Sequence, residues 1–374
     1  MNIPLVDLVA QYRTIQPEVD KAIQSVLESG QFILGPQVEA LEREVASYLG
    51  TTHAVGVGSG TDALVLALRA LDIGPGDEVI VPTYTFFATA EAVMLVGATP
   101  VFVDIEPVTN GIDVEQVRKK VSDRTKAIIA VHLFGHPADM AALLECAREH
   151  GVRVIEDNAQ AIGAEYRGQK TGSLGDVGCL SVFPSKNLGA YGDAGMLVTN
   201  NAEIAERVQM LRTHGWRKKY LPELVGCNSR LDELQAAILR VKLRHLEAWN
   251  QERQGLAAVY ERVFAGSTNI VVPREARGSK HVYHLYVLQV EGRDRVQHFL
   301  KTRGIASGVY YPKPVHAVDA CRGYGGTGER YPVAERCAGA SLAIPLYPEL
   351  TSANVRVIAA TVKEALGTTE SIHT

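Results

Sequence analysis

Three short segments of the sequence carry residue types that could do chemistry together. In the first, GVGSGTDAL at 56–64, a β-rich run leads into a Gly-Ser-Gly-Thr turn, and a helical pattern begins near Asp62. Free N–H groups at a helix start carry a partial positive charge, and glycine lets a phosphate approach the backbone. Taken alone, the pattern is more typical of an ordinary strand-to-helix turn with Ser and Thr caps.

The other two segments each bring one ionisable side chain to a turn. VIEDNAQA at 154–161 places Asp157 at the end of a buried β-rich run, and ligands of open α/β sheets bind at the carboxyl ends of strands. SVFPSKNLGAYGDAG at 181–195 places Lys186 in a turn rich in Pro, Ser, Asn and Gly. Considered separately, the carboxylate is typical of a helix cap and the lysine of a solvated surface charge.

Together, the phosphate-binding turn, the strand-end carboxylate and the lysine are the parts that a pyridoxal phosphate site needs. The lysine would form a Schiff base with the aldehyde of the cofactor. The carboxylate would keep the ring nitrogen protonated, because a nearby negative charge favours the charged form. Since a protonated ring stabilises a neighbouring carbanion, the three segments predict pyridoxal phosphate chemistry.

A regular alternation of strands and helices must position these segments. From Val55 to about residue 200, short β-branched and apolar runs alternate with helical patterns, which is typical of a parallel sheet with helices on its faces. The predicted helices include 62–71 and 138–151, and the second ends at a Gly suited to a helix C-cap. The predicted strands are 53–58, 78–82, 99–105, 127–134, 153–159, 178–183 and 195–200.

The remainder of the chain has a different pattern. A long helix that links two domains is predicted from about Ser229, because Ser229 and Asp232 form an S-x-x-D capping box. Farther along, a strand at 281–290 and helices at 294–303 and 351–366 indicate an α+β unit. We therefore expect a large cofactor domain over 1–245 and a small domain over 246–374. The apolar stripe expected along the long helix is Leu231, Leu234, Ile238, Val241 and Trp249.

Composition excludes several classes of protein. With 374 residues, 46% hydrophobic and 21% charged, the chain has enough apolar material for two globular domains. Its 38 basic and 42 acidic residues give a net charge of −4, which argues against a nucleic-acid partner. No run approaches the length of a membrane span, and no export signal is visible at the start. We expect a cytoplasmic protein with reduced cysteines, namely Cys146, Cys179, Cys227, Cys321 and Cys337.

At these motifs the sequence resembles the DegT/DnrJ/StrS group of sugar aminotransferases, pyridoxal phosphate enzymes of the aspartate aminotransferase fold. The resemblance extends over nearly the whole chain. It implies fold type I, an α/β architecture with a mostly parallel seven-stranded sheet in the large domain and a smaller C-terminal α+β domain. The similar segments are FILGPQVEALERE (32–44), GSGTDAL (58–64), GPGDEVIVPTYTF (74–86), VHLFGHPADM (131–140), IEDNAQA (155–161), SVFPSKNLGAYGDAG (181–195), GCNSRLDELQAAIL (226–239) and YYPKPVH (310–316).

The resemblance also implies a role for individual residues. Lys186 would be the Schiff-base lysine and the proton carrier, and Asp157 the partner of the ring nitrogen. Gln160 would lie beside the 3-hydroxyl of the ring and Phe86 would stack on the ring. The remaining implied cofactor ligands bind phosphate, and they are Gly60, Thr61, Ser181 and, from the neighbouring subunit of a homodimer, Asn228.

The implied reaction moves an amino group from glutamate, by way of pyridoxamine phosphate, to a keto group of a nucleotide-linked sugar. LRTHGWRKKY (211–220) and HLEAWN (245–250) look closest to enzymes that aminate C3 of dTDP-3-keto-6-deoxyhexoses. A UDP-linked 3-keto sugar acid and a 4-keto sugar are the alternatives. Candidate substrate contacts are Arg217, Lys218, Arg230, Tyr311 and His316.

Three other interpretations carry less support from the residues. The G-x-G-x-x-G pattern at 323–328 lacks a preceding strand, which argues against a nicotinamide-dependent sugar oxidoreductase. His132 and His136 do not share one helix face, so we expect no metal site there. A regulatory protein on the same scaffold is the third alternative. Because Lys186 and Asp157 are both present, catalysis is the favoured interpretation.

Overall fold

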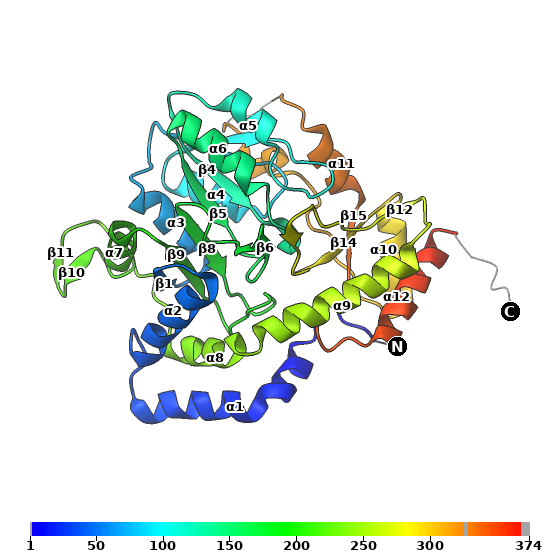
Figure 1. Ribbon diagram of the computed structural model, residues 1–374, viewed down its shortest axis with the longest axis horizontal. Coiled ribbons are helices and arrows are strands. Elements are labelled where there is room, and N and C mark those ends of the chain that lie inside the picture. The colour runs from blue at the N-terminus through cyan, green and yellow to red at the C-terminus, as the bar shows by residue number, and fades with distance from the viewer. Residues whose placement is uncertain (1, 325–327, 368–374) are drawn as a thin grey trace.

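The computed structural model describes residues 2–324 and 328–367, and its centre is a seven-stranded sheet (Figure 1). The strand order is β1-β9-β8-β5-β4-β2-β3. Strands β5, β4, β2, β3 and β8 pair in parallel, and β9 runs antiparallel to both of its neighbours. The expected mostly parallel sheet is therefore confirmed. The strands are β1 (His53–Val57), β2 (Glu78–Pro82), β3 (Thr99–Val103), β4 (Thr125–Val131), β5 (Arg153–Asp157), β8 (Val177–Ser181) and β9 (Gly195–Thr199).

Helices cover both faces of this sheet because its strands are apolar on both sides. In β2, Val79 and Val81 belong to one core cluster and Ile80 to another on the opposite face. The first face is covered by α3 (Gly60–Ala70), α4 (Ala88–Leu95) and α7 (Ala202–Leu211). The second is covered by α2 (Pro36–Leu49), α5 (Val114–Lys120), α6 (Met140–His150) and α8 (Glu233–Leu243).

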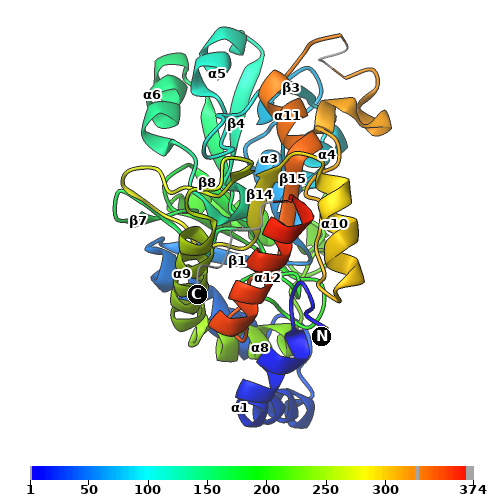
Figure 2. The same ribbon diagram turned by 90° about the vertical axis from the view of Figure 1, so that its right-hand side faces the viewer.

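A second, antiparallel sheet lies beside the first and has the order β12-β14-β15. Helices α9, α10 and α12 surround it in Figure 2, and Tyr260, Leu288 and Ile358 are among their shared buried residues. The N-terminal Ile3 joins the same cluster through a bridge to Ile305. These elements are α9 (Leu246–Phe264), β12 (Ile270–Val271), β14 (Tyr286–Val290), α10 (Arg293–Thr302), α11 (Pro332–Ala340), β15 (Ser341–Ile344) and α12 (Ser352–Ala365).

The predicted long helix is wrong in two respects. It is two helices, since α8 ends at Leu243 and α9 begins at Leu246. The capping box does not form either, because the Ser229 hydroxyl donates to Asp62 Oδ2 at 2.6 Å and accepts from the Gly58 N–H at 3.0 Å. Ser229 therefore secures the turn before α3, and α8 begins later, after Asp232.

The predicted strand at 281–290 is too long at its start. Tyr283 has a φ of 45°, a left-handed conformation that cannot continue a strand. The chain instead passes along residues 134–135, where Val282 N–H donates to the Gly135 carbonyl at 3.0 Å. The two helices expected at 294–303 and 351–366 are confirmed as α10 and α12.

The sequence analysis did not include several elements. The longest of them is α1 (Leu8–Ser29), which packs along α8. The shortest include β6 (Glu165–Tyr166), β7 (Gln169–Lys170), β10 (Trp216–Lys218), β11 (Leu221–Pro222), β13 (Ser279–Lys280) and the 3-10 turns at Leu133–Gly135, Val315–Ala317 and Asp319–Cys321. The pattern at 323–328 lies partly outside the described residues. No helix in the described part of the chain combines the length and apolarity needed to cross a bilayer.

Candidate active site

A cavity of about 460 Å³ opens at the carboxyl ends of β5 and β8. Its walls come from the first turn of α3, the loop after β2, the loop between β8 and β9, and the segments that precede β14 and follow α10. The structure brings eight residues singled out from the sequence to this one cavity. They are Gly60, Thr61, Phe86, Asp157, Gln160, Ser181, Lys186 and Tyr311.

One end of the cavity is a turn of backbone N–H groups and hydroxyls. Ser59 caps α3 by accepting from the Asp62 N–H at 3.0 Å, and the N–H groups of the first helical turn have no acceptor within the helix. A Cβ atom on Gly60 would lie 2.6 Å from the Ser181 Cβ. Only glycine therefore allows α3 to begin this close to β8, with Thr61 and Ser181 lining the same space.

Asp157 ends β5 with its carboxylate in the cavity wall. The side chain is 7% exposed; its Oδ2 accepts from Thr89 Oγ1 at 2.8 Å and its Oδ1 from the Ala159 N–H at 3.2 Å. Burial raises the pKa of this carboxyl, and the two hydrogen bonds and the nearby Lys186 offset part of that rise. A buried carboxylate of this kind is stabilised by a positively charged partner in the cavity.

Lys186 lies on the loop between β8 and β9, opposite that carboxylate. Its side chain is reached from the cavity but is otherwise enclosed by protein. Burial lowers the pKa of Lys186 to about 8, although the charge of Asp157 acts in the opposite direction. Near neutral pH an appreciable fraction of this amine is therefore uncharged and nucleophilic.

Buried polar contacts fix the loop on the far side of Lys186. Lys242 of α8 is fully buried and donates to the Gly189 carbonyl at 2.6 Å. Asn187 donates to Asn250 Oδ1 at 2.8 Å and to the Val282 carbonyl at 3.1 Å. Helices α8 and α9 thereby hold the backbone that carries the lysine.

Gln160 and two aromatic residues form a further part of the wall. The Gln160 amide accepts from the Phe134 N–H at 2.7 Å and donates to the Tyr311 hydroxyl at 3.1 Å. The Phe86 ring lies 5.9 Å from that of Tyr311, centroid to centroid, and its side chain is 57% exposed. These contacts place one amide donor and two rings beside Asp157.

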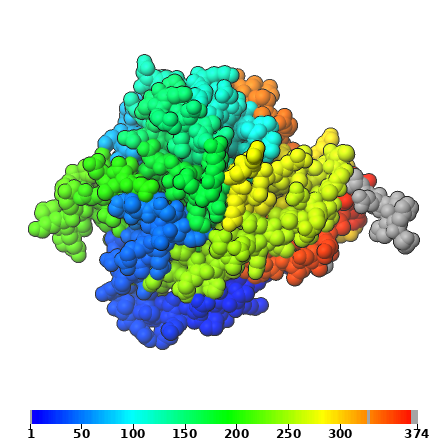
Figure 3. Space-filling model, viewed as in Figure 1, coloured from blue at the N-terminus to red at the C-terminus, as the bar shows by residue number. Residues whose placement is uncertain are grey.

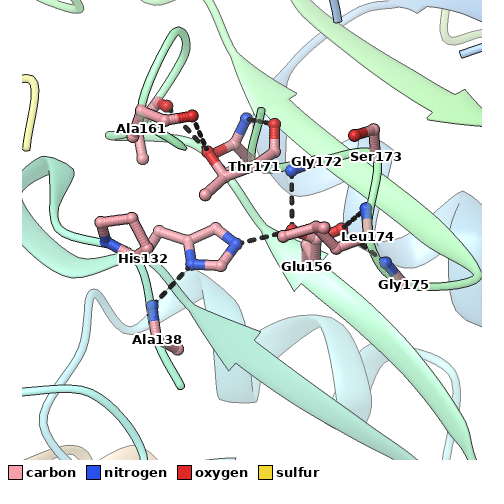
Figure 4. A network of polar contacts seen from close by, with 12 residues as sticks. His132, Ala138, Glu156, Ala161, Thr171, Gly172, Ser173, Leu174 and Gly175 are labelled. Carbon is pink, nitrogen blue, oxygen red and sulfur yellow. Dashed lines mark hydrogen bonds and ion pairs between the residues drawn. The ribbon is translucent and has the colours of Figure 1, made fainter. Parts of the chain in front are cut away.

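The residue before Asp157 anchors the strand from the opposite face of the sheet (Figure 4). Glu156 is fully buried and accepts from the N–H groups of Gly172, Leu174 and Gly175 at 2.7 Å each. It also pairs with His132 Nε2 at 2.8 Å. Because His132 Nδ1 accepts from the Ala138 N–H at 3.0 Å, Nε2 carries the hydrogen. His132 therefore serves this structural network.

The other residues singled out from the sequence do not line the cavity. Arg217 and Lys218 lie on the β10–β11 hairpin, which projects from one end of the molecule (Figure 3). Asn228 is exposed and bridges to Thr213. Arg230 has a buried Nε without an acceptor among the described residues. His316 Nδ1 lies 2.6 Å from Thr83 Oγ1, and its ring packs against Tyr331.

The structure adds cavity residues that the sequence analysis did not select. Thr89 orients Asp157 from α4, and Arg253 of α9 and His284 line the cavity. Each sits inside an ordinary helical or β-rich pattern, where a threonine, an arginine or a histidine carries no distinguishing spacing. Only the tertiary packing of α4 and α9 on the sheet reveals them.

Comparison with known families identifies a match along almost the entire chain. Residues 13–363 match the DegT/DnrJ/EryC1/StrS aminotransferase family. This range includes every residue singled out above. The family expected from the sequence motifs is confirmed.

Several characterised relatives match the chain over nearly their whole length. A UDP-N-acetyl-3-dehydro-alpha-D-glucosamine 3-aminotransferase of Acidithiobacillus ferrooxidans is 48% identical, over 97% of this chain and 98% of the relative. A dTDP-3-amino-3,4,6-trideoxy-alpha-D-glucose transaminase of Streptomyces venezuelae is 47% identical, over 93% and 92% respectively. A pleiotropic regulatory protein of Geobacillus stearothermophilus is also 47% identical, over 94% and 95%.

Solved structures give the same result. DesV of S. venezuelae superposes with a TM-score of 0.96 at 45% identity, covering 99% of this chain and all of that one. NtdA of Bacillus subtilis, solved with the cofactor pyridoxamine phosphate bound, superposes with a TM-score of 0.90 at 30% identity. That match covers 98% of this chain and 85% of NtdA. The fold is therefore that of the pyridoxal phosphate aminotransferases, as expected.

Proposed function

This chain belongs to the DegT/DnrJ/EryC1/StrS aminotransferase family, and we propose that it uses pyridoxal phosphate to aminate a nucleotide-linked keto sugar. The donor is L-glutamate and the acceptor is the C3 keto group of a dTDP-linked 3-keto-6-deoxyhexose. One observation carries the proposal: Lys186, the Asp157 carboxylate and the turn at Gly60 line the same cavity.

The residues present fit the cofactor. The absence of a Cβ at Gly60 lets α3 begin close to Ser181, so the N–H groups of α3, Thr61 and Ser181 border one space that suits a phosphate. The buried Asp157 suits a protonated ring nitrogen, and Gln160 presents an amide donor to a ring hydroxyl. When bound, pyridoxal phosphate supplies an aldehyde for an amino group and a ring that takes up electrons from the adjacent carbon.

Side chains of the protein would hold the cofactor and transfer the protons. Lys186 Nζ would hold the cofactor, and as a free amine it would take and return a proton at the reacting carbon. Its lowered pKa, about 8, keeps the neutral amine available for this transfer. The Asp157 carboxylate would keep a proton on the ring nitrogen, and the hydrogen bond from Thr89 fixes its orientation. The rings of Tyr311 and Phe86 would pack beside the cofactor ring in the cavity wall.

The sugar assignment is supported by the relatives named above. The S. venezuelae transaminase is named for a 3-amino dTDP-sugar and is 47% identical, and DesV has the same fold with a TM-score of 0.96. A UDP-linked 3-keto sugar is the second candidate, because the A. ferrooxidans relative acts on one and is 48% identical. Both candidates are aminated at C3.

We also propose a homodimer with shared sites and a cofactor domain over 1–245 that the remainder of the chain closes. Asn228 and Arg230 lie outside the cavity of their own chain, beside the projecting hairpin. A second copy would bring them, with Arg217 and Lys218, to the neighbouring cavity. His316 contacts Thr83 within its own chain. It would contact the sugar only after a shift of the loop that carries it.

The deciding experiment offers the purified holoenzyme L-glutamate together with dTDP-linked 3-keto and 4-keto sugars and UDP-linked 3-keto sugars. Products are identified by mass spectrometry and NMR. We expect the 3-amino dTDP-sugar to form fastest. Preference for the UDP-sugar or for C4 would overturn the substrate assignment, and no amination of any sugar would favour a regulatory role instead.

A further inference from the structure

An arginine is buried in the wall of the cavity, apart from the groups assigned above. Arg253, on α9, is 3% exposed and lines the same cavity as Lys186. The lining of this cavity also includes the apolar side chains of Leu5, Val6 and Leu346. A charged guanidinium in such surroundings is costly unless an anion or several hydrogen bonds stabilise it.

Protein acceptors bind only some of the N–H donors of this guanidinium. Arg253 Nη1 donates to the Leu346 carbonyl at 2.8 Å and to the Tyr283 carbonyl at 3.4 Å. Its Nε is buried without an acceptor among the described residues. Burial lowers the pKa of Arg253 to about 10, and the charge of Glu349 raises it only in part. The two side chains do not bond, since Glu349 Oε1 has no hydrogen-bond partner among the described residues. Among residues 2–324 and 328–367, the guanidinium therefore has no adjacent counter-ion.

A hydrogen-bond acceptor lies close to this cation. His284 lines the cavity, and its Nδ1 lies 3.2 Å from Asn187 Oδ1. Because the Asn187 amide nitrogen already donates to Asn250 and Val282, its oxygen must accept, so His284 carries its hydrogen on Nδ1. Burial, Lys186 and Arg253 all lower the pKa of His284, which keeps Nε2 an acceptor.

We propose that Arg253 binds the α-carboxylate of the amino-acid donor and that His284 Nε2 accepts a hydrogen from the donor's amino group. This assignment rests on the proposed aminotransferase function and names a donor subsite within it. The planar N–H fork of arginine matches a carboxylate, and the enclosed apolar wall suits a small amino acid. A keto sugar lacks this carboxylate and does not use the subsite.

The test separates the two half-reactions of the holoenzyme by stopped-flow absorbance of the cofactor. Arg253→Gln should slow conversion by L-glutamate at least about 100-fold, as expected when a buried charge partner is removed. With 4-aminobutyrate, which has no carboxylate next to its amine, the same variant should change the rate by less than about threefold. The rate of the second half-reaction, in which the keto sugar accepts the amino group, should also change by less than about threefold.

A binding measurement complements the kinetics. Calorimetry with glutarate, a dicarboxylate that cannot react, should show affinity weakened at least about tenfold in Arg253→Gln. Arg293→Gln is the matched control, because Arg293 is also largely buried and donates to the Ala338 and Ser341 carbonyls, but outside the cavity. It should bind glutarate as the wild type does. If Arg253→Gln does not fold, Arg253→Lys should retain the fold and show an intermediate loss.

The outcomes distinguish this inference from the proposed function. Equal losses with glutamate and 4-aminobutyrate, or unchanged rates with both, would overturn the donor subsite while wild-type turnover still supports the aminotransferase. A wild-type protein whose cofactor is converted by none of these amines would overturn both.

Discussion

The cavity interior and the β10–β11 hairpin differ in how their charged side chains are surrounded: by protein in the cavity and by solvent on the hairpin. In the cavity, Asp157 is buried and Lys186 is enclosed, and protein contacts hold the backbone around each. On the hairpin, Arg217 makes ion pairs with Glu206 at 3.2 Å and Glu223 at 3.8 Å that are open to solvent. Exposed ion pairs of this kind contribute little to stability.

The two regions also differ in the exposure of their apolar side chains. Tyr220 is 73% exposed and Val225, just after β11, is 85% exposed, whereas the interior of the large sheet is fully covered. The cavity interior is therefore lined by buried groups of one chain and, in our proposal, carries the chemistry once a second copy adds Asn228. The other region leaves apolar side chains uncovered and carries, in our proposal, the contacts between subunits. The following predictions test that division.

Replacing the interior lysine should have the largest effect. Lys186→Ala removes both the attachment point of the cofactor and the proton carrier, so transamination should fall at least about 10³-fold. Steady-state assays with glutamate and the keto sugar measure this loss. Lys301→Ala, on the exposed surface of α10, is the control and should behave as wild type. Appreciable activity in Lys186→Ala would refute the mechanism.

Neutralising the interior carboxylate should have the next largest effect. Asp157→Asn preserves the shape of the side chain and can keep the hydrogen bond from Thr89, but it removes the negative charge that favours a protonated ring. We expect kcat/KM to fall about 100-fold or more. Thr89→Val, which removes only the orienting hydrogen bond, should cost about tenfold. Equal activity of Asp157→Asn and wild type would contradict the role of the charge.

The capture of pyridoxal phosphate by the apoprotein should depend on pH through Lys186. Only the uncharged amine attacks an aldehyde, and its fraction rises as pH increases through the pKa of about 8. Between about pH 6 and pH 8 the rate should therefore rise about 50-fold and then level off. The rate of capture is measured at a series of pH values from the change in absorbance of pyridoxal phosphate. A rate that keeps rising until about pH 10 would show that burial does not lower this pKa.

Mixing two inactive variants tests the shared site and should have the smallest effect. Lys186→Ala subunits retain Asn228, and Asn228→Ala subunits retain Lys186, so each mixed dimer would contain one intact site. If subunits exchange at random, about one quarter of the wild-type activity should return. The unmixed variants, carried through the same exchange procedure, are the controls. Absence of any recovery would argue that Asn228 does not act across the interface.

The sequence predicted the large sheet well because its strands are local signals. β-branched runs bounded by Gly, Pro or Asp predicted all seven strands, and Asp157 ends one of them while Lys186 lies in the loop after another. The division between α8 and α9 was missed, since the apolar stripe through Ile238 and Trp249 continues across the break. Ser229 was misjudged because its partner, Asp62, is distant in sequence.

The missed cavity residues have a similar explanation. Arg253 lies on α9 among polar residues that the helical pattern assigns to a solvated face, and only the packing of α9 against the β14 region buries it. Lys242 of α8 was missed for the same reason. It is fully buried, and its amine donates to the Gly189 carbonyl instead of to water. Long-range packing of this kind leaves no mark in local periodicity.

The central claim, that Lys186 carries the cofactor, is tested most directly by trapping. The holoenzyme is reduced with borohydride, digested, and mapped by tandem mass spectrometry. We predict a pyridoxyl group on the peptide that contains Lys186 and on no other lysine. A pyridoxyl group on Lys242 or another lysine, with Lys186 unmodified, would contradict this account.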